Sequence, residues 1–107
     1  MTDGCHHVWN QYTVRVTGGR RDALQKYLAE RQIGSAIYYP VPLHLQKCFA
    51  SSGYREGSLP ATEQASREVL SLPVYPELTA AEQSAVIDAI ERFCGAQSST
   101  AGQRAVA

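Results

Sequence analysis

Apolar and polar residues alternate near the start of the chain. Between residues 7 and 16 one parity carries the apolar side chains and the other the polar ones: Val8, Tyr12, Val14 and Val16 against Gln11, Thr13 and Arg15. This period of two predicts a half-buried strand from His7 to Val16. Asn10 interrupts the apolar parity. Its amide is either hydrogen-bonded to its local surroundings or directed into a cleft.

A helical pattern follows after Gly18 and Gly19. Apolar or amphipathic side chains recur at every third or fourth position between Arg21 and Gln32: Leu24, Tyr27, Leu28 and Arg31. This spacing predicts a helix, and Gly34 stands where a C-cap glycine ends one. Residues 35–39 then predict a second strand, so the chain opens with strand, helix and strand.

The second half of the chain predicts two more helices. Pro60 suits the first position of a helix, because no intrahelical partner exists there for the N–H that proline lacks. That helix ends near Pro73, and residues 69–72 could equally form a short strand. Thr79 and Glu82 have the spacing of a capping box, which predicts a final helix from Ala80 to about Cys94. Gly95 is expected to end it.

These elements predict an α+β fold. We expect a small mixed sheet of about three short strands, with three main helices packed chiefly on one face. Residues 6–95 form the predicted domain, residues 1–5 a disordered N-terminus and residues 96–107 a flexible tail.

Composition narrows the functional classes. The chain has 107 residues, a hydrophobic fraction of 44% and a net charge of zero, which fits one small domain with a thin core. A neutral chain without a basic stripe lacks the electrostatic footprint of nucleic-acid binding. No apolar run has the length of a membrane span or the position of a signal sequence. Three widely spaced cysteines argue against a disulfide framework and suit the cytoplasm.

Candidate chemistry centres on the segment from Tyr38 to Gln46. Pro40 and Pro42 exclude a helix and a central strand, so a rigid extended bend follows the predicted strand. The bend presents His44 at its far end and Tyr39 at its start. These side chains either line a cleft or belong to a stiff connector whose aromatic residues enter the core. A metal site at Cys5, His6 and His7 is not expected, because no fourth ligand stands at a recognisable spacing.

Four sequence blocks occur in a distinctive order. They are His7–Arg15 followed by Arg21–Leu24, Ile33–Gly34 through Tyr39–His44, Gly53–Tyr54 through Pro60–Glu63, and Leu70–Thr79. Together they resemble the C-terminal part of the DegT/DnrJ/EryC1/StrS family of sugar aminotransferases, over about residues 6–94. The chain departs from many relatives at Tyr38, where they carry a histidine before the Tyr-Pro pair.

The resemblance implies that the chain has the fold of a C-terminal small domain. Such domains belong to the fold-type I aminotransferases, which use pyridoxal 5'-phosphate (PLP). Such enzymes are usually homodimers and transfer an amino group, commonly from glutamate, to a keto group of a nucleotide-linked sugar. It also implies His44, Tyr39 and Asn10 as candidates for the substrate or cofactor cleft.

The family's Schiff-base lysine belongs to a large N-terminal domain. This sequence has two lysines, Lys26 and Lys47, and neither matches that position. We therefore expect no catalytic residue and no bound cofactor in this segment, whose partner would be the missing large domain. The alternative is a stand-alone α+β module that binds a partner or metabolite without catalysis.

Overall fold

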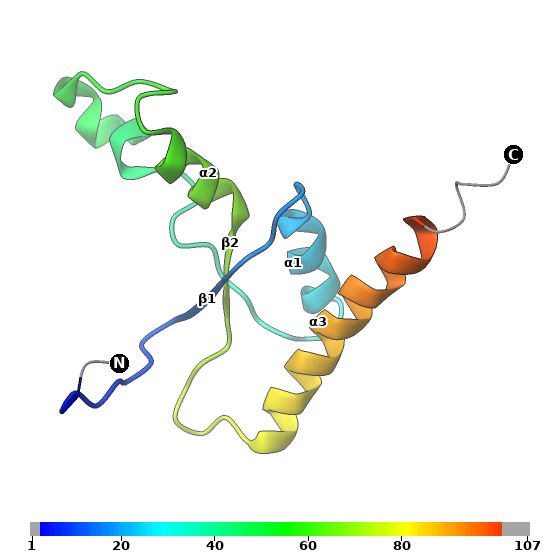
Figure 1. Cartoon of the computed structure of the whole chain (residues 1–107). Coiled ribbons are helices and arrows are strands. Elements are labelled where there is room, and N and C mark those ends of the chain that lie inside the picture. Colours follow the sequence, from blue (N-terminus) through cyan, green and yellow to red (C-terminus); the bar gives the residue numbers. More distant parts are fainter. Residues whose placement is uncertain (1–2, 102–107) are drawn as a thin grey trace, which may run out of the picture.

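The computed structural model describes residues 3–101, with side chains described as far as residue 95. The regular elements follow one another along the chain as strand β1 (Tyr12–Arg15), helix α1 (Arg21–Ala29), the 3₁₀-helices η1 (Leu43–Leu45) and η2 (Lys47–Ser52), helix α2 (Pro60–Glu68), strand β2 (Val69–Leu72) and helix α3 (Ala80–Ala101). Figure 1 shows β1 and β2 crossing the centre, with α1 and α3 on one side. The α+β class is therefore confirmed.

The sheet has two strands in the described part of the chain. Strand β1 pairs antiparallel with β2, from Tyr12 opposite Leu72 to Arg15 opposite Val69. The N-terminal strand is shorter than predicted. The residue after Leu72 is Pro73, which has no N–H to donate, so the ladder cannot extend toward residues 7–11.

The predicted third strand at residues 35–39 is wrong. Ala36 makes one isolated bridge with Ser71, through backbone hydrogen bonds of 3.0 Å and 2.7 Å. Beyond residue 39 a ladder could not continue, because Pro40 and Pro42 lack the N–H groups that it would need. This segment therefore pairs with β2 at one residue only and then continues into the proline bend.

The core lies between α1, α3 and the sheet. Its buried apolar side chains come from the segment after β1, from α1, from β2 and from α3: Val16, Leu24, Leu28, Leu70, Ala89 and Phe93. Tyr27 of α1 packs against the Phe93 ring, with 5.4 Å between the ring centroids. Because this core takes its side chains from both halves of the sequence, it holds the two strands and the two helices together.

Helix α2 lies apart from this core. With η1 and η2 it forms an arm, residues 38–68, that extends away from α1 and α3 in Figure 1. Pro60 is the first residue of α2, as predicted.

Helix α3 is longer than predicted. It continues through Gly95 to Ala101, so Gly95 does not end it. A glycine inside a helix costs only about 1 kcal/mol relative to alanine, and surrounding helix formers can outweigh that cost. The predicted tail at residues 96–107 thus begins inside α3, and residues 102–107 lie outside the described part of the chain.

Candidate functional site

His44 lies in η1, directly after the proline bend. Its side chain is buried, with 6% of its surface exposed, and its Nε2 atom lies 3.0 Å from Oε1 of Glu63. The sequence left open whether His44 lines a cleft or belongs to a stiff connector packed into the fold. The structure shows features of both, because this buried, hydrogen-bonded histidine also lines a cleft.

Glu63 was not among the residues predicted for the site. It lies in the first turn of α2, and its carboxylate accepts hydrogen bonds from the backbone N–H groups of Gly57 and Leu59. Hydrogen bonds hold the pKa of Glu63 below its usual value of 4.5. The bond from Gly57 has the largest effect, and the bond to His44 has the next largest. An acidic residue in a first helical turn is a common sequence feature, so nothing in the sequence marks His44 as its partner.

The loop before α2 supplies the donor at Gly57. Residues 55–58 form a turn in which the Ser58 N–H bonds to the Arg55 carbonyl at 3.0 Å. Gly57 occupies its third position with φ of 85°, a value that a type II turn requires there and that glycine adopts without steric cost. The turn therefore directs the Gly57 N–H at the carboxylate of Glu63.

Tyr39 and His44 line the same cleft, which we call the Tyr39–His44 cleft. It has a volume of about 420 Å³ and is lined mainly by apolar side chains from the bend, η1 and α2: Tyr38, Tyr39, Pro42, Leu43, His44, Leu59, Thr62, Ala65, Ser66 and Val69. Tyr39 is 60% exposed, so it forms the rim of the cleft. The His44 and Tyr54 rings lie in a T-shaped arrangement, with 6.1 Å between their centroids.

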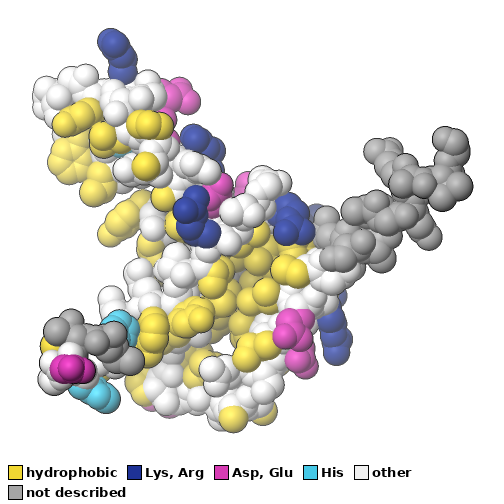
Figure 2. Space-filling view, viewed as in Figure 1, with side chains coloured by type: hydrophobic (Ala, Val, Ile, Leu, Met, Phe, Trp, Pro, Cys, Tyr) yellow, Lys and Arg dark blue, Asp and Glu magenta, His cyan; other side chains and the backbone are white. Residues whose placement is uncertain are grey.

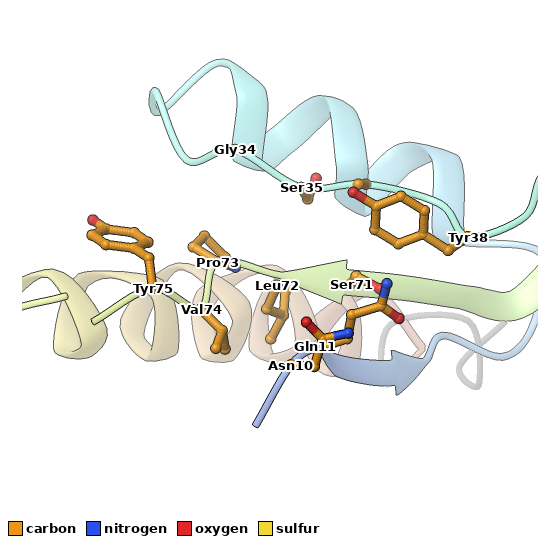
Figure 3. Close-up of a pocket in the computed structure, with 11 residues that line it drawn as sticks. Asn10, Gln11, Gly34, Ser35, Tyr38, Ser71, Leu72, Pro73, Val74 and Tyr75 are labelled. Carbon is orange, nitrogen blue, oxygen red and sulfur yellow. The ribbon is translucent and has the colours of Figure 1, made fainter. Parts of the chain in front are cut away.

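Asn10 lies in a different cleft of about 490 Å³. Figure 3 shows this pocket between the chain before β1, the segment at residues 34–38 and the segment after β2. Asn10 and Gln11 lie on one side, Ser35 on the other, and the Tyr38 and Tyr75 rings stand at opposite ends. Tyr38 lines both clefts. The structure thus brings together two of the three predicted site residues and places Asn10 separately.

The lysines do not fit a cofactor site in this part of the protein. Lys26 of α1 and Lys47 of η2 are both exposed, and neither lines the Tyr39–His44 cleft. A lysine that binds a carbonyl cofactor needs a desolvated or cationic environment that lowers its pKa. Neither lysine has that environment in the part of the chain that the structure describes.

Two other features bear on the kind of site. Residues 3–101 contain no group of three or more His, Cys, Asp or Glu side chains placed to hold a metal ion. Within the same residues, no helix combines the length and apolar character that crossing a membrane requires.

Comparisons with known proteins agree with the sequence resemblance. The chain is 50% identical over 91 residues to a pleiotropic regulatory protein of Geobacillus stearothermophilus, covering 85% of this chain and 24% of that protein. It is 41% identical to a dTDP-3-amino-3,6-dideoxy-alpha-D-galactopyranose transaminase of Aneurinibacillus thermoaerophilus, covering 87% of this chain and 24% of the relative. The chain thus spans about a quarter of the length of these relatives.

A solved structure gives the same result. The crystal structure of S. venezuelae DesV superposes with a TM-score of 0.76 at 42% identity, covering 82% of this chain and 23% of DesV. The family profile of the DegT/DnrJ/EryC1/StrS aminotransferases matches residues 1–91, which include both clefts and the His44–Glu63 pair. The chain therefore belongs to the DegT/DnrJ/EryC1/StrS aminotransferase family.

Proposed function

We propose that this chain is the C-terminal segment of a PLP-dependent aminotransferase that transfers an amino group, from glutamate, to a keto group of a nucleotide-linked sugar. The observation that carries the proposal is the 42% identity and TM-score of 0.76 to DesV across most of this chain. Two relatives named as dTDP-sugar transaminases, at 41% and 43% identity, support the class of substrate. Three free cysteines suit a cytoplasmic enzyme.

The segment contributes one wall of the substrate cleft. His44 and Tyr39 stand on this wall, on a bend that two prolines make rigid. Asn10 stands at a second hollow on the same segment. Because neither lysine fits the cofactor, we assign cofactor binding to the remaining three quarters of the enzyme, and we expect the isolated segment to be inactive.

An exposed apolar surface supports a missing partner domain. The arm exposes large apolar side chains along its length: Tyr38, Tyr39, Val41, Leu43, Phe49, Tyr54 and Leu59. Figure 2 shows hydrophobic side chains gathered over this arm, at the upper left. A surface of this kind marks an interaction site. It favours a segment that packs against a large domain and against a second subunit of a homodimer. A self-sufficient binding module would not need to expose such a surface.

Cofactor binding tests this assignment directly. We expect the purified chain, mixed with PLP, to show no stoichiometric absorbance band of lysine-bound cofactor. Adding the large domain of a close relative, in trans or by fusion, should create that band, together with amination of a dTDP-linked keto sugar. Lys26→Ala and Lys47→Ala should leave the band of the fusion unchanged.

Two results would contradict the proposal. One is a stoichiometric band from the isolated chain that disappears in either lysine variant. The other is a fusion that binds the cofactor, folds cooperatively and transfers no amino group to any sugar nucleotide.

A further inference from the structure

The buried His44–Glu63 pair joins two elements that are separate in the sequence. His44 comes from η1 and Glu63 from α2, and 6% of each side chain is exposed. A buried ionisable pair away from the protein core is costly unless all its polar atoms have partners. The arrangement of these partners indicates what the pair does.

Glu63 acts as an acceptor in each of its hydrogen bonds. The Gly57 N–H lies 2.9 Å from Oε1 and 3.0 Å from Oε2, and the Leu59 N–H lies 3.3 Å from Oε1. A carboxylate that receives two backbone donors in this way stays ionised at neutral pH and has no proton to give. The hydrogen shared with His44 must therefore be carried by Nε2 of the histidine, at 3.0 Å from Oε1.

In the neutral form of His44, this bond also sets the role of the other ring nitrogen. When Nε2 of a neutral imidazole carries the proton, Nδ1 is an acceptor. In the described part of the chain, no buried side-chain nitrogen or oxygen lacks a hydrogen-bond partner, and Nδ1 of His44 makes no hydrogen bond within the protein. Nδ1 is therefore not fully buried, and His44 lines the Tyr39–His44 cleft.

The surroundings of His44 in that cleft are mostly apolar. Much of the lining is apolar and comes from Pro42, Leu43, Leu59 and Val69. Thr62 and Ser66 add small polar side chains. A hydrogen-bond acceptor on an apolar wall selects a ligand group that can donate, because an unmatched ligand would leave the acceptor desolvated. A sugar hydroxyl or an amino group can donate in this way.

We propose that Glu63 is a positioning residue, which fixes the neutral ring of His44 so that Nδ1 accepts a hydrogen bond from a hydroxyl or amino group of the substrate. The inference about the ligand rests on the function proposed above, whereas the inference about the ring does not. Glu63 itself acts through His44, and Gly57 and Leu59 hold its carboxylate in place.

The state of the ring can be measured on the 107-residue chain by ¹H–¹⁵N NMR. We expect one imidazole Nε2–H that exchanges slowly and resonates downfield, because it is bonded to a buried carboxylate. His44→Gln should remove this signal and assign it. Glu63→Gln should shift it upfield, since a neutral acceptor forms a weaker bond, and Glu63→Leu should abolish it.

Glu68 provides the matched control for this measurement. It is on the same helix, has a lowered pKa, and bonds to Arg15 instead of to a histidine. Glu68→Gln should leave the Nε2–H signal in place. A proton found on Nδ1 of His44, or a signal indifferent to both Glu63 substitutions, would overturn the assignment.

The role in substrate binding is tested in the fusion with a large domain. The NH2 group of glutamine can take the place of Nε2–H, so His44→Gln can keep the bond to Glu63. It removes Nδ1, and its own acceptor, the carbonyl oxygen, stands at a different position. We expect His44→Gln to retain the unfolding midpoint and lose most of kcat/KM for the dTDP-linked keto sugar. Glu63→Gln should lose less, and Glu68→Gln none.

The outcomes separate the two proposals. Full kcat/KM in folded His44→Gln would overturn the assignment of Nδ1 to the substrate. An inactive unmodified fusion would overturn the proposed function, and the NMR measurement would still decide whether Glu63 positions His44.

Discussion

Glu63 receives hydrogen bonds from two backbone N–H groups as well as from His44. Each bond favours the ionised carboxylate, so the folded state lowers the pKa of Glu63 relative to the unfolded chain. At the scale of single residues, the ionised carboxylate of Glu63 thus links the loop before α2 to the His44 ring in the cleft.

The pH dependence of stability follows from this lowered pKa. A carboxyl group whose pKa is depressed by folding stabilises the protein above its unfolded pKa, and this contribution is lost as pH falls through the folded pKa. We therefore expect the free energy of unfolding to decrease once pH falls below about 4.5, the usual value for glutamate. Urea unfolding at a series of pH values measures it.

Glu63→Gln is the informative variant in that series. It should be less stable than the unmodified chain at neutral pH and should lose less stability on acidification, because one of the groups with a lowered pKa has been removed. The pKa values of Glu68 and Glu82 are also lowered. These two residues therefore preserve part of the pH dependence of stability in Glu63→Gln. An acid limb of unchanged slope in Glu63→Gln would contradict the prediction.

At the scale of elements, the start of α3 is set by short-range contacts. Glu82 N–H donates to Oγ1 of Thr79 at 3.2 Å, and Thr79 N–H donates to Oε2 of Glu82 at 2.8 Å. The Thr79 carbonyl accepts the first helical bond, from the Gln83 N–H. The predicted capping box is confirmed. Its partners are three residues apart, which is why local sequence reveals it.

Replacing the cap should destabilise the chain measurably. We expect Thr79→Ala to lower the free energy of unfolding by about 1 kcal/mol, because an N–H of the first turn loses its acceptor. Thr79→Ser keeps the hydroxyl and should cost much less. Chemical denaturation of the three proteins measures the difference, and an unchanged midpoint in Thr79→Ala would show that this cap contributes nothing.

At the scale of the whole molecule, the chain is extended. Its Cα radius of gyration is 17.7 Å, whereas a compact domain of this length has about 13 Å. Its accessible surface is 8483 Å², against about 5,900 Å² for a folded monomer of this mass. Both differences arise because the arm and α3 extend from a small core, and they support a segment completed by other parts of a larger protein.

The isolated chain should therefore self-associate. We expect sedimentation velocity to show species larger than the monomer that increase with concentration, because the arm exposes Leu43 and Phe49. Leu43→Ser with Phe49→Ser should shift the distribution toward monomer. Ile87→Ser removes an equally exposed apolar side chain of α3 and serves as the control. A monodisperse monomer at all concentrations would favour the stand-alone module.

The sequence alone determined the features that depend on neighbours in the chain. The capping box at Thr79, Pro60 at the start of α2 and the rigid bend before His44 all follow from interactions within a few residues, and ordered motifs identified the family. Only the tertiary structure decided which distant residues meet. It paired His44 with Glu63, reduced the third strand to the bridge at Ala36 and placed Asn10 in a separate cleft. Such contacts depend on how the whole chain packs, because their partners are 19 or more residues apart.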